Sequence, residues 1–76
     1  NLSSIDADLG RYFGTDKGAL LIRASDALPG LKSGDVITAV DGRPVESPRD
    51  VMRALGDKEA GEKLKVRVLR NRAAQE

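Results

Sequence analysis

Apolar residues in this chain gather in short runs separated by glycine and aspartate. A Gly-Asp pair precedes the middle run, residues 36–40, and an Asp-Gly pair follows it, before a second short apolar piece. Short β-branched runs bounded in this way are typical of strands joined by a tight turn. The pattern predicts a strand over residues 36–40, with Ile37 and Val40 buried, then a turn and a short second strand.

Two further runs predict strands. Residues 18–24 are apolar and short enough for a buried strand, and residues 1–5 fit the end of another strand. From Gly61 a last strand is expected, alternating over residues 63–70. Its inward side chains are Leu64, Val66 and Val68, and its charged side, which suits an edge strand, carries Lys63, Lys65 and Arg67. From Arg70 onward, including Arg72, we expect a frayed terminus.

Helical spacing predicts a short helix near the start of the chain. Asp6 is placed to cap it, and Gly14 is placed to end it. Leu9, Tyr12 and Phe13 share one face. We expect the two aromatic rings to anchor this helix to the core.

The main helix is predicted to follow Ser47, with Pro48 at the first helical position and Asp50 completing a shortened capping box. It is expected to fray between residues 56 and 60. Residues 25–31 form at most one helical turn, because a proline and a glycine interrupt them.

The order of elements indicates a small α+β domain that is mainly β. The chain has 76 residues, 39% of them hydrophobic and 33% charged, which is ordinary for one folded domain. No apolar run reaches the ~20 residues that span a bilayer, so we expect no membrane insertion. The N-terminus shows no signal-peptide pattern, and we infer a domain excised from a longer parent.

The composition argues against most catalytic chemistry. Without cysteine there are no disulfides or thiolate metal sites, and without histidine the serines have no imidazole to activate them. An autonomous hydrolase is therefore the weakest hypothesis, and we predict no catalytic residue, cofactor or metal. A net charge of +1 predicts no nucleic-acid partner.

Residues 31–45, LKSGDVITAVDGRPV, resemble the GL-x-x-GD-x-I-x-x-x-x-G-x-x-V segment of PDZ domains, in particular the bacterial type attached to periplasmic serine proteases of the HtrA/Deg kind. Residues 18–22, the Ser-Pro-capped helix and residues 61–70 match in the same order. The resemblance covers residues 2–70. It implies a single PDZ-like domain over residues 1–76: a partly open β-sandwich or barrel with one main helix and one or two short ones.

The resemblance also implies a binding site. A C-terminal or extended peptide would add as a strand between residues 1–5 and the helix at residues 48–56. The matching positions are Asn1, Leu2, Ser3, Ser4, Ile5, Pro48, Arg49, Met52 and Leu55, while Val51 and Ala54 face the core. The first strand and the loop that binds the ligand carboxylate would lie upstream of residue 1, and an alternative alignment places that loop at residues 11–15.

These features favour a peptide- or protein-binding module that regulates or targets an envelope protease and is not itself an enzyme. The resemblance implies a periplasmic or cell-envelope location. The alternative is a structural docking module of an envelope or secretion assembly with no free-peptide ligand. An exposed sheet edge makes a homodimer plausible as well.

Overall fold

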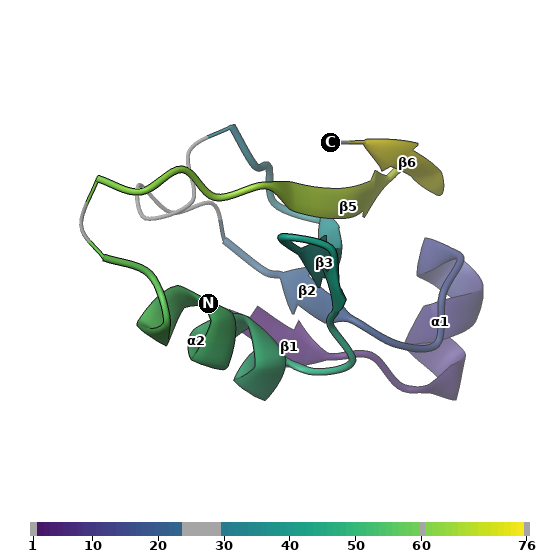
Figure 1. Ribbon diagram of the computed structural model, residues 1–76. Helices are drawn as coiled ribbons and strands as arrows, with labels where there is room; N and C mark the ends of the chain where they lie inside the picture. The colour runs from purple at the N-terminus through teal and green to yellow at the C-terminus, as the bar shows by residue number, and fades with distance from the viewer. Residues whose placement is uncertain (1, 24–29, 60, 76) are drawn as a thin grey trace.

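The computed structural model describes residues 2–23, 30–59 and 61–75, so most of the expected turn at residues 25–31 lies outside it. Within these ranges the chain forms six strands and two helices (Figure 1). In chain order they are β1 (Leu2–Ser4), α1 (Ala7–Phe13), β2 (Ala19–Leu21), β3 (Val36–Val40), β4 (Arg43–Pro44), α2 (Pro48–Gly56), β5 (Val66–Arg70) and β6 (Ala73–Gln75).

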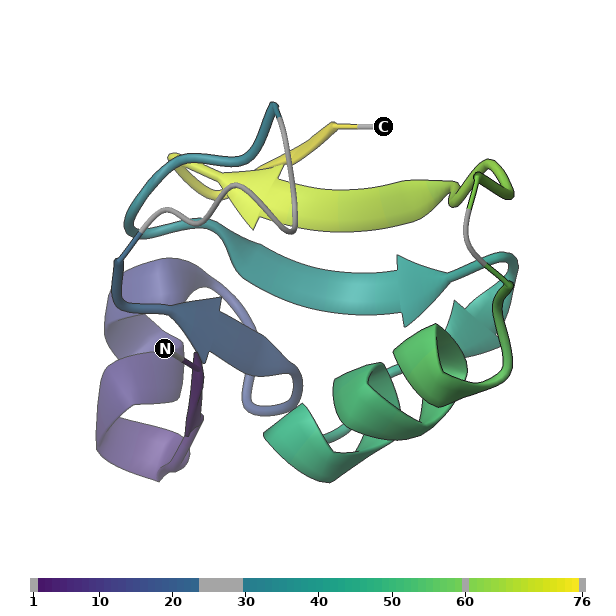
Figure 2. The ribbon, with the colours of Figure 1, turned by 90° about the vertical axis from the view of Figure 1, so that its left-hand side faces the viewer.

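All six strands belong to one antiparallel sheet. The strand order is β1-β2-β3-β5-β6, and β4 pairs with β3. Ala19 lies opposite Ile37, which in turn lies opposite Val68. The sheet is not closed into a barrel, and α2 lies on one side of it while α1 lies on the other (Figures 1 and 2). This architecture confirms the predicted PDZ-like α+β class.

The hydrophobic core fills the space between α2 and the sheet. Val51 of α2 is 1% exposed, and it packs in one cluster with Ala19, Ile37, Val40 and other sheet residues. The predicted burial of Ile37 and Val40 is therefore confirmed. Each such side chain contributes about 1.5–3 kcal/mol when it is fully removed from water, so this layer supplies much of the stabilisation of a small domain.

Asp35 is a charged residue buried at the start of β3, with 1% of its surface exposed. Its carboxylate accepts hydrogen bonds from Nε and Nη2 of Arg70, at 2.9 and 2.7 Å, and from the backbone N–H of Lys32 at 2.8 Å. The hydrogen bond from Arg70 holds the pKa of Asp35 below its usual value, although burial acts in the opposite direction. The ion pair joins the turn before β3 to the end of β5.

The prediction of a frayed C-terminus is wrong. β6 pairs with β5, and Asn71 and Arg72, with φ of 52° and 67°, form a two-residue turn between them. Two consecutive residues with positive φ match the turn that best suits a hairpin. β5 therefore has a neighbour on each side and is not the edge strand that we expected.

Two predicted strands prove shorter. β2 covers Ala19–Leu21 and not residues 18–24, and Ile22 just beyond it is 54% exposed. β5 begins at Val66 and not at residue 61 or 63, although the predicted alternation holds, since Val68 is buried while Lys65 and Arg67 are exposed. Pairing ends where the chain bends away from its neighbours, which the apolar pattern does not encode.

The predicted caps of α1 are confirmed, but its predicted anchors are not. Asp6 accepts a hydrogen bond from the N–H of Leu9 at 2.8 Å, and Gly14 ends the helix with φ of 84°. Tyr12, however, is 73% exposed and does not anchor α1 to the core. The guanidinium of Arg72 instead donates to the main-chain carbonyls of Arg11 and Tyr12, at 2.9 and 3.0 Å.

The start of α2 also differs in detail from the prediction. Ser47 is the N-cap residue and Pro48 follows it, but the serine side chain makes no capping hydrogen bond. Asp50 accepts from the N–H of Glu46 at 2.9 Å, so its bond reaches one residue farther upstream than a capping box requires. The helix ends at Gly56, within the predicted range.

We expect Asp35→Asn to lower the free energy of unfolding by about 1–3 kcal/mol at neutral pH, because Arg70 loses its carboxylate partner. Since the pKa of Asp35 is lowered in the folded chain, the contribution of the pair is complete above the ordinary carboxyl pKa of about 4 and is lost as the pH falls through the lowered value. Urea melts from about pH 2 to pH 7 test this. A constant stability difference across that range would contradict it.

Two helical glycines should respond oppositely to alanine. A Cβ at Gly10 would lie 2.6 Å from the backbone oxygen of Thr15, whereas a Cβ at Gly56 would meet nothing within 4 Å. Alanine improves helix propensity by about 1 kcal/mol, but at Gly10 we expect the clash to dominate and cost about 1–3 kcal/mol. Gly56→Ala should stabilise the chain. Thermal or urea melts of both variants test the pair, and a shift in the same direction for both would refute it.

Candidate functional site

β1 forms one edge of the sheet and carries the N-terminal half of the candidate site. It pairs with β2 through Leu2 opposite Leu21, Ser3 opposite Leu20 and Ser4 opposite Ala19. No other described strand pairs with it. An unpaired edge presents main-chain N–H and C=O groups to any strand that approaches, so β1 has the geometry needed to accept one more strand.

The helix α2 lies close to β1 and supplies the second half (Figure 1). Val51 is buried, as predicted, whereas the next residue, Met52, is 63% exposed. Successive helical residues point about 100° apart, which accounts for this contrast. The exposed methionine gives α2 an apolar surface that the core does not use.

The structure brings the two predicted segments together but gives their residues different burial. On β1, Leu2 and Ser3 are half-buried and Ser4 is exposed, while Asn1 lies outside the described residues. Pro48 and Leu55 are half-buried, and Arg49 is exposed. Because Leu2 and Leu55 also pack against the core cluster, they offer less free surface than Met52.

The alternative alignment, with the carboxylate loop at residues 11–15, does not fit the sheet. In that alignment β2 would be the strand that pairs with the ligand. β2 already pairs with β1 on one side and with β3 on the other. Residues 11–13 belong to α1, and Gly14 caps that helix.

Ion pairs join the C-terminal end of α2 to the sheet. The carboxylate of Asp41, in the β3–β4 turn, forms an ion pair with the ammonium of Lys58. It also accepts a hydrogen bond from the backbone N–H of Lys65 at 2.9 Å. These hydrogen bonds lower the pKa of Asp41, and the bond to Asp41 raises the pKa of Lys58. Arg43 and Asp57 add a longer contact of 3.8 Å. These partly exposed contacts add little to the packing of Val51, which positions the helix beside the core.

The described part of the chain gathers no group of three or more Asp and Glu residues able to hold a metal ion. None of the helices within it is long and apolar enough to cross a bilayer. The edge of β1 presents main-chain groups and α2 presents the exposed side chain of Met52, and main-chain hydrogen bonds and apolar contacts are the two components of strand addition.

Comparison with known proteins agrees with this geometry. A sequence profile described as "PDZ domain" matches residues 8–76. A "Probable periplasmic serine endoprotease DegP-like" of Brucella suis is 42% identical over 65 residues, covering 80% of this chain and 13% of the relative. One of the same description from Pseudomonas putida is 34% identical over 76 residues, covering 92% of this chain and 16% of the relative.

A third relative, the "Periplasmic pH-dependent serine endoprotease DegQ" of Escherichia coli, is 32% identical over 75 residues, covering 91% of this chain and 16% of the relative. The chain thus spans well under a fifth of the length of these relatives. The profile match covers most of the chain, and the open sheet with its two helices agrees with it. The chain therefore belongs to the PDZ domain family, whose members bind peptides or proteins.

Proposed function

We propose that this PDZ domain captures a C-terminal or extended peptide by strand addition to β1, and that it does so as part of a periplasmic serine protease. The unpaired edge of β1 beside α2 is the observation that carries the first part. The names of the relatives, and their sequence identity to this chain, support the second part, the periplasmic serine protease. In such a protein the domain would regulate the protease or bring substrates to it.

The peptide would run antiparallel to β1 and exchange main-chain hydrogen bonds with it. Along an extended chain, side chains alternate between the two faces, so every second one points toward α2. There Met52 is the most exposed apolar residue, flanked by Pro48 and Leu55 one turn away on either side. A methionine side chain is flexible and polarizable, which suits a pocket that accepts different side chains. Arg49 would lie at the rim.

A peptide titration tests the proposal directly. The domain, extended upstream to include the segment that we propose holds the carboxylate loop, is titrated against a library of C-terminal peptides. We expect saturable binding that perturbs the amide resonances of β1 and α2. The absence of saturable binding to any peptide would overturn the proposal and leave a structural docking module as the better description.

The same edge supports pairing between two copies of the chain. Because one side of β1 has no partner among the described strands, two β1 strands could join the sheets of two molecules. Sedimentation at increasing protein concentration would detect this, and a saturating peptide ligand should dissociate the dimer, because both need the same edge. A dimer that persists at full peptide occupancy would show that a different surface joins the copies.

Val51 and Met52 should separate stability from binding. We expect Val51→Ala to cost about 1–3 kcal/mol in unfolding free energy, because it removes buried methyl groups, and Met52→Ala to cost less than about 1 kcal/mol. Met52→Ala should weaken peptide binding about tenfold. Leu9→Ala is the control, since it removes an exposed apolar side chain of α1, on the other side of the sheet. Unchanged affinity in Met52→Ala would remove α2 from the site.

A further inference from the structure

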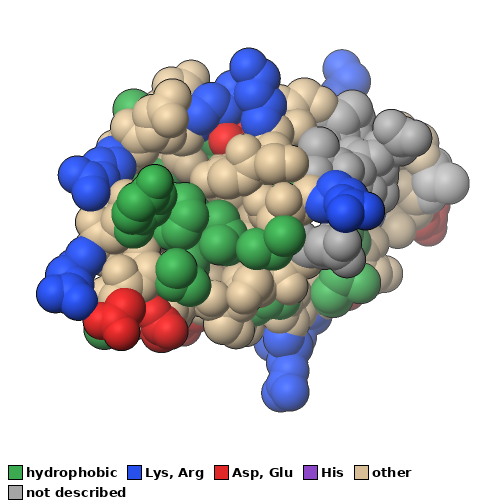
Figure 3. Space-filling view, turned by 180° about the vertical axis from the view of Figure 1, so that it is seen from behind, with side chains coloured by type: hydrophobic (Ala, Val, Ile, Leu, Met, Phe, Trp, Pro, Cys, Tyr) green, Lys and Arg blue, Asp and Glu red, His purple; other side chains and the backbone are tan. Residues whose placement is uncertain are grey.

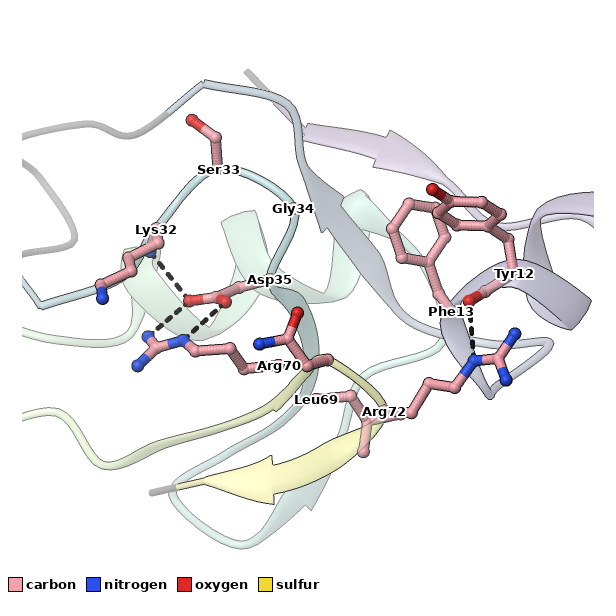
Figure 4. Close-up of a pocket in the computed structure, with 10 residues that line it drawn as sticks. Tyr12, Phe13, Lys32, Ser33, Gly34, Asp35, Leu69, Arg70 and Arg72 are labelled. Atoms are coloured by element: carbon pink, nitrogen blue, oxygen red, sulfur yellow. Dashed lines mark hydrogen bonds and ion pairs between the residues drawn. The ribbon is translucent and has the colours of Figure 1, made fainter.

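A second pocket lies on the side of the sheet that carries α1. Its volume is about 500 Å³, and three segments distant in sequence form it: the end of α1, the turn at residues 32–35 and the β5–β6 hairpin. Figure 4 shows Tyr12 and Phe13 on one side of this pocket and Lys32, Asp35 and Arg70 on the other. We call it the α1–hairpin pocket. It shares no residue with the candidate site on β1 and α2.

The lining of the α1–hairpin pocket carries an excess of positive charge. Its charged members are Lys32, Arg70, Arg72 and Asp35. Asp35 neutralises Arg70. Arg72 donates to neutral main-chain carbonyls, which leave its charge uncompensated. Lys32 lies near enough to Asp35 to lower its pKa, so three cationic side chains share one carboxylate in this lining.

One wall of the pocket is aromatic and exposed. The ring of Tyr12 stands edge-on to the ring of Phe13, with centroids 5.1 Å apart and an angle of 70°. Tyr12 is 73% exposed, so its ring is available for contact with another molecule. Seen from behind, the molecule shows a band of hydrophobic side chains with lysine and arginine side chains above it and at its ends (Figure 3). Exposed aromatic residues beside cations are the residue types enriched at binding hot spots.

The walls of the pocket are held in place by hydrogen bonds within the chain. Arg70 binds both carboxylate oxygens of Asp35 and fixes the turn against β5. Arg72 fixes the end of α1 against the hairpin. A site held in this way loses little conformational freedom when a ligand enters, which favours binding.

We propose that the α1–hairpin pocket binds an acidic segment of a partner protein. One carboxylate of that segment would face Lys32 at one end of the pocket and a second would face Arg72 at the other (Figure 4), while an apolar side chain between them would pack on Tyr12. Because α1 and α2 lie on different sides of the sheet (Figure 2), and the pocket has no lining residue from β1 or α2, both sites can be occupied at once. A nucleic acid is less suited, because its affinity depends on neutralising many phosphates and this pocket offers two charges.

The test uses the ¹⁵N-labelled 76-residue chain and a peptide of sequence Gly-Asp-Leu-Glu-Trp-Glu-Gly, acetylated and amidated so that it lacks a terminal carboxylate. We expect saturable shift changes at residues 12–13, 32–35 and 69–72, and weaker binding as salt is added. A peptide with Asn and Gln in place of Asp and Glu should bind about tenfold more weakly. Shift changes confined to β1 and α2, or equal binding of the two peptides, would overturn the proposal.

Matched variants locate the interaction. Lys32→Ala should weaken binding of the acidic peptide about fivefold, and Tyr12→Ala should do so by a similar factor. Both residues are exposed, so the chain should remain folded. Lys63→Ala removes an exposed lysine outside the pocket and should change nothing. Equal loss in Lys63→Ala and Lys32→Ala, or tighter binding of a single-stranded oligonucleotide to the same residues, would overturn the proposal.

Discussion

The buried carboxylate of Asp35 is the constraint on which the arrangement of this domain depends. A buried charge is costly unless it is paired and hydrogen-bonded, and Arg70, thirty-five residues away, provides that pairing. The same turn bonds to β2, since Leu21 donates to the carbonyl of Asp35 and accepts from the N–H of Gly34. Three strands therefore meet at one residue. An arrangement of the strands that buried Asp35 away from Arg70 would leave its charge unpaired, which is strongly unfavourable.

The two sides of the sheet are used differently. Against α2 the sheet is covered by a buried layer of valine, isoleucine and alanine, and the helix retains an exposed methionine beside the edge strand. Toward α1 the contacts are polar, made by guanidinium groups to carbonyls and to a carboxylate. Apolar packing sets the position of α2, whereas directional hydrogen bonds set the position of α1. This division accounts for the exposed apolar side chain of Met52 on one side and the basic pocket on the other.

The sequence predicted the features that depend on local pattern. The burial of Ile37 and Val40, the caps of α1 and the start of α2 follow from apolar runs, aspartate, glycine and proline. It did not predict β6, because Ala-Ala-Gln has little strand preference and an Asn-Arg turn lacks the usual glycine. The roles of Arg70 and Arg72 depend on partners far away in sequence, which no local window reveals. For the candidate site on β1 and α2, helical periodicity predicted only that the side chains of Val51 and Met52 point in different directions. The assignment of the binding residues came from the family resemblance.

Arg72 donates hydrogen bonds to the end of α1 across a long stretch of sequence. Its partners Tyr12 and Arg11 lie 60 and 61 positions earlier in the chain. Closing so long a loop costs entropy that only the completed contact offsets. During synthesis, α1 can make this contact only after Arg72 has left the ribosome, 60 positions after Tyr12. Until then α1 lacks the hydrogen bonds that fasten its C-terminal end to the β5–β6 hairpin.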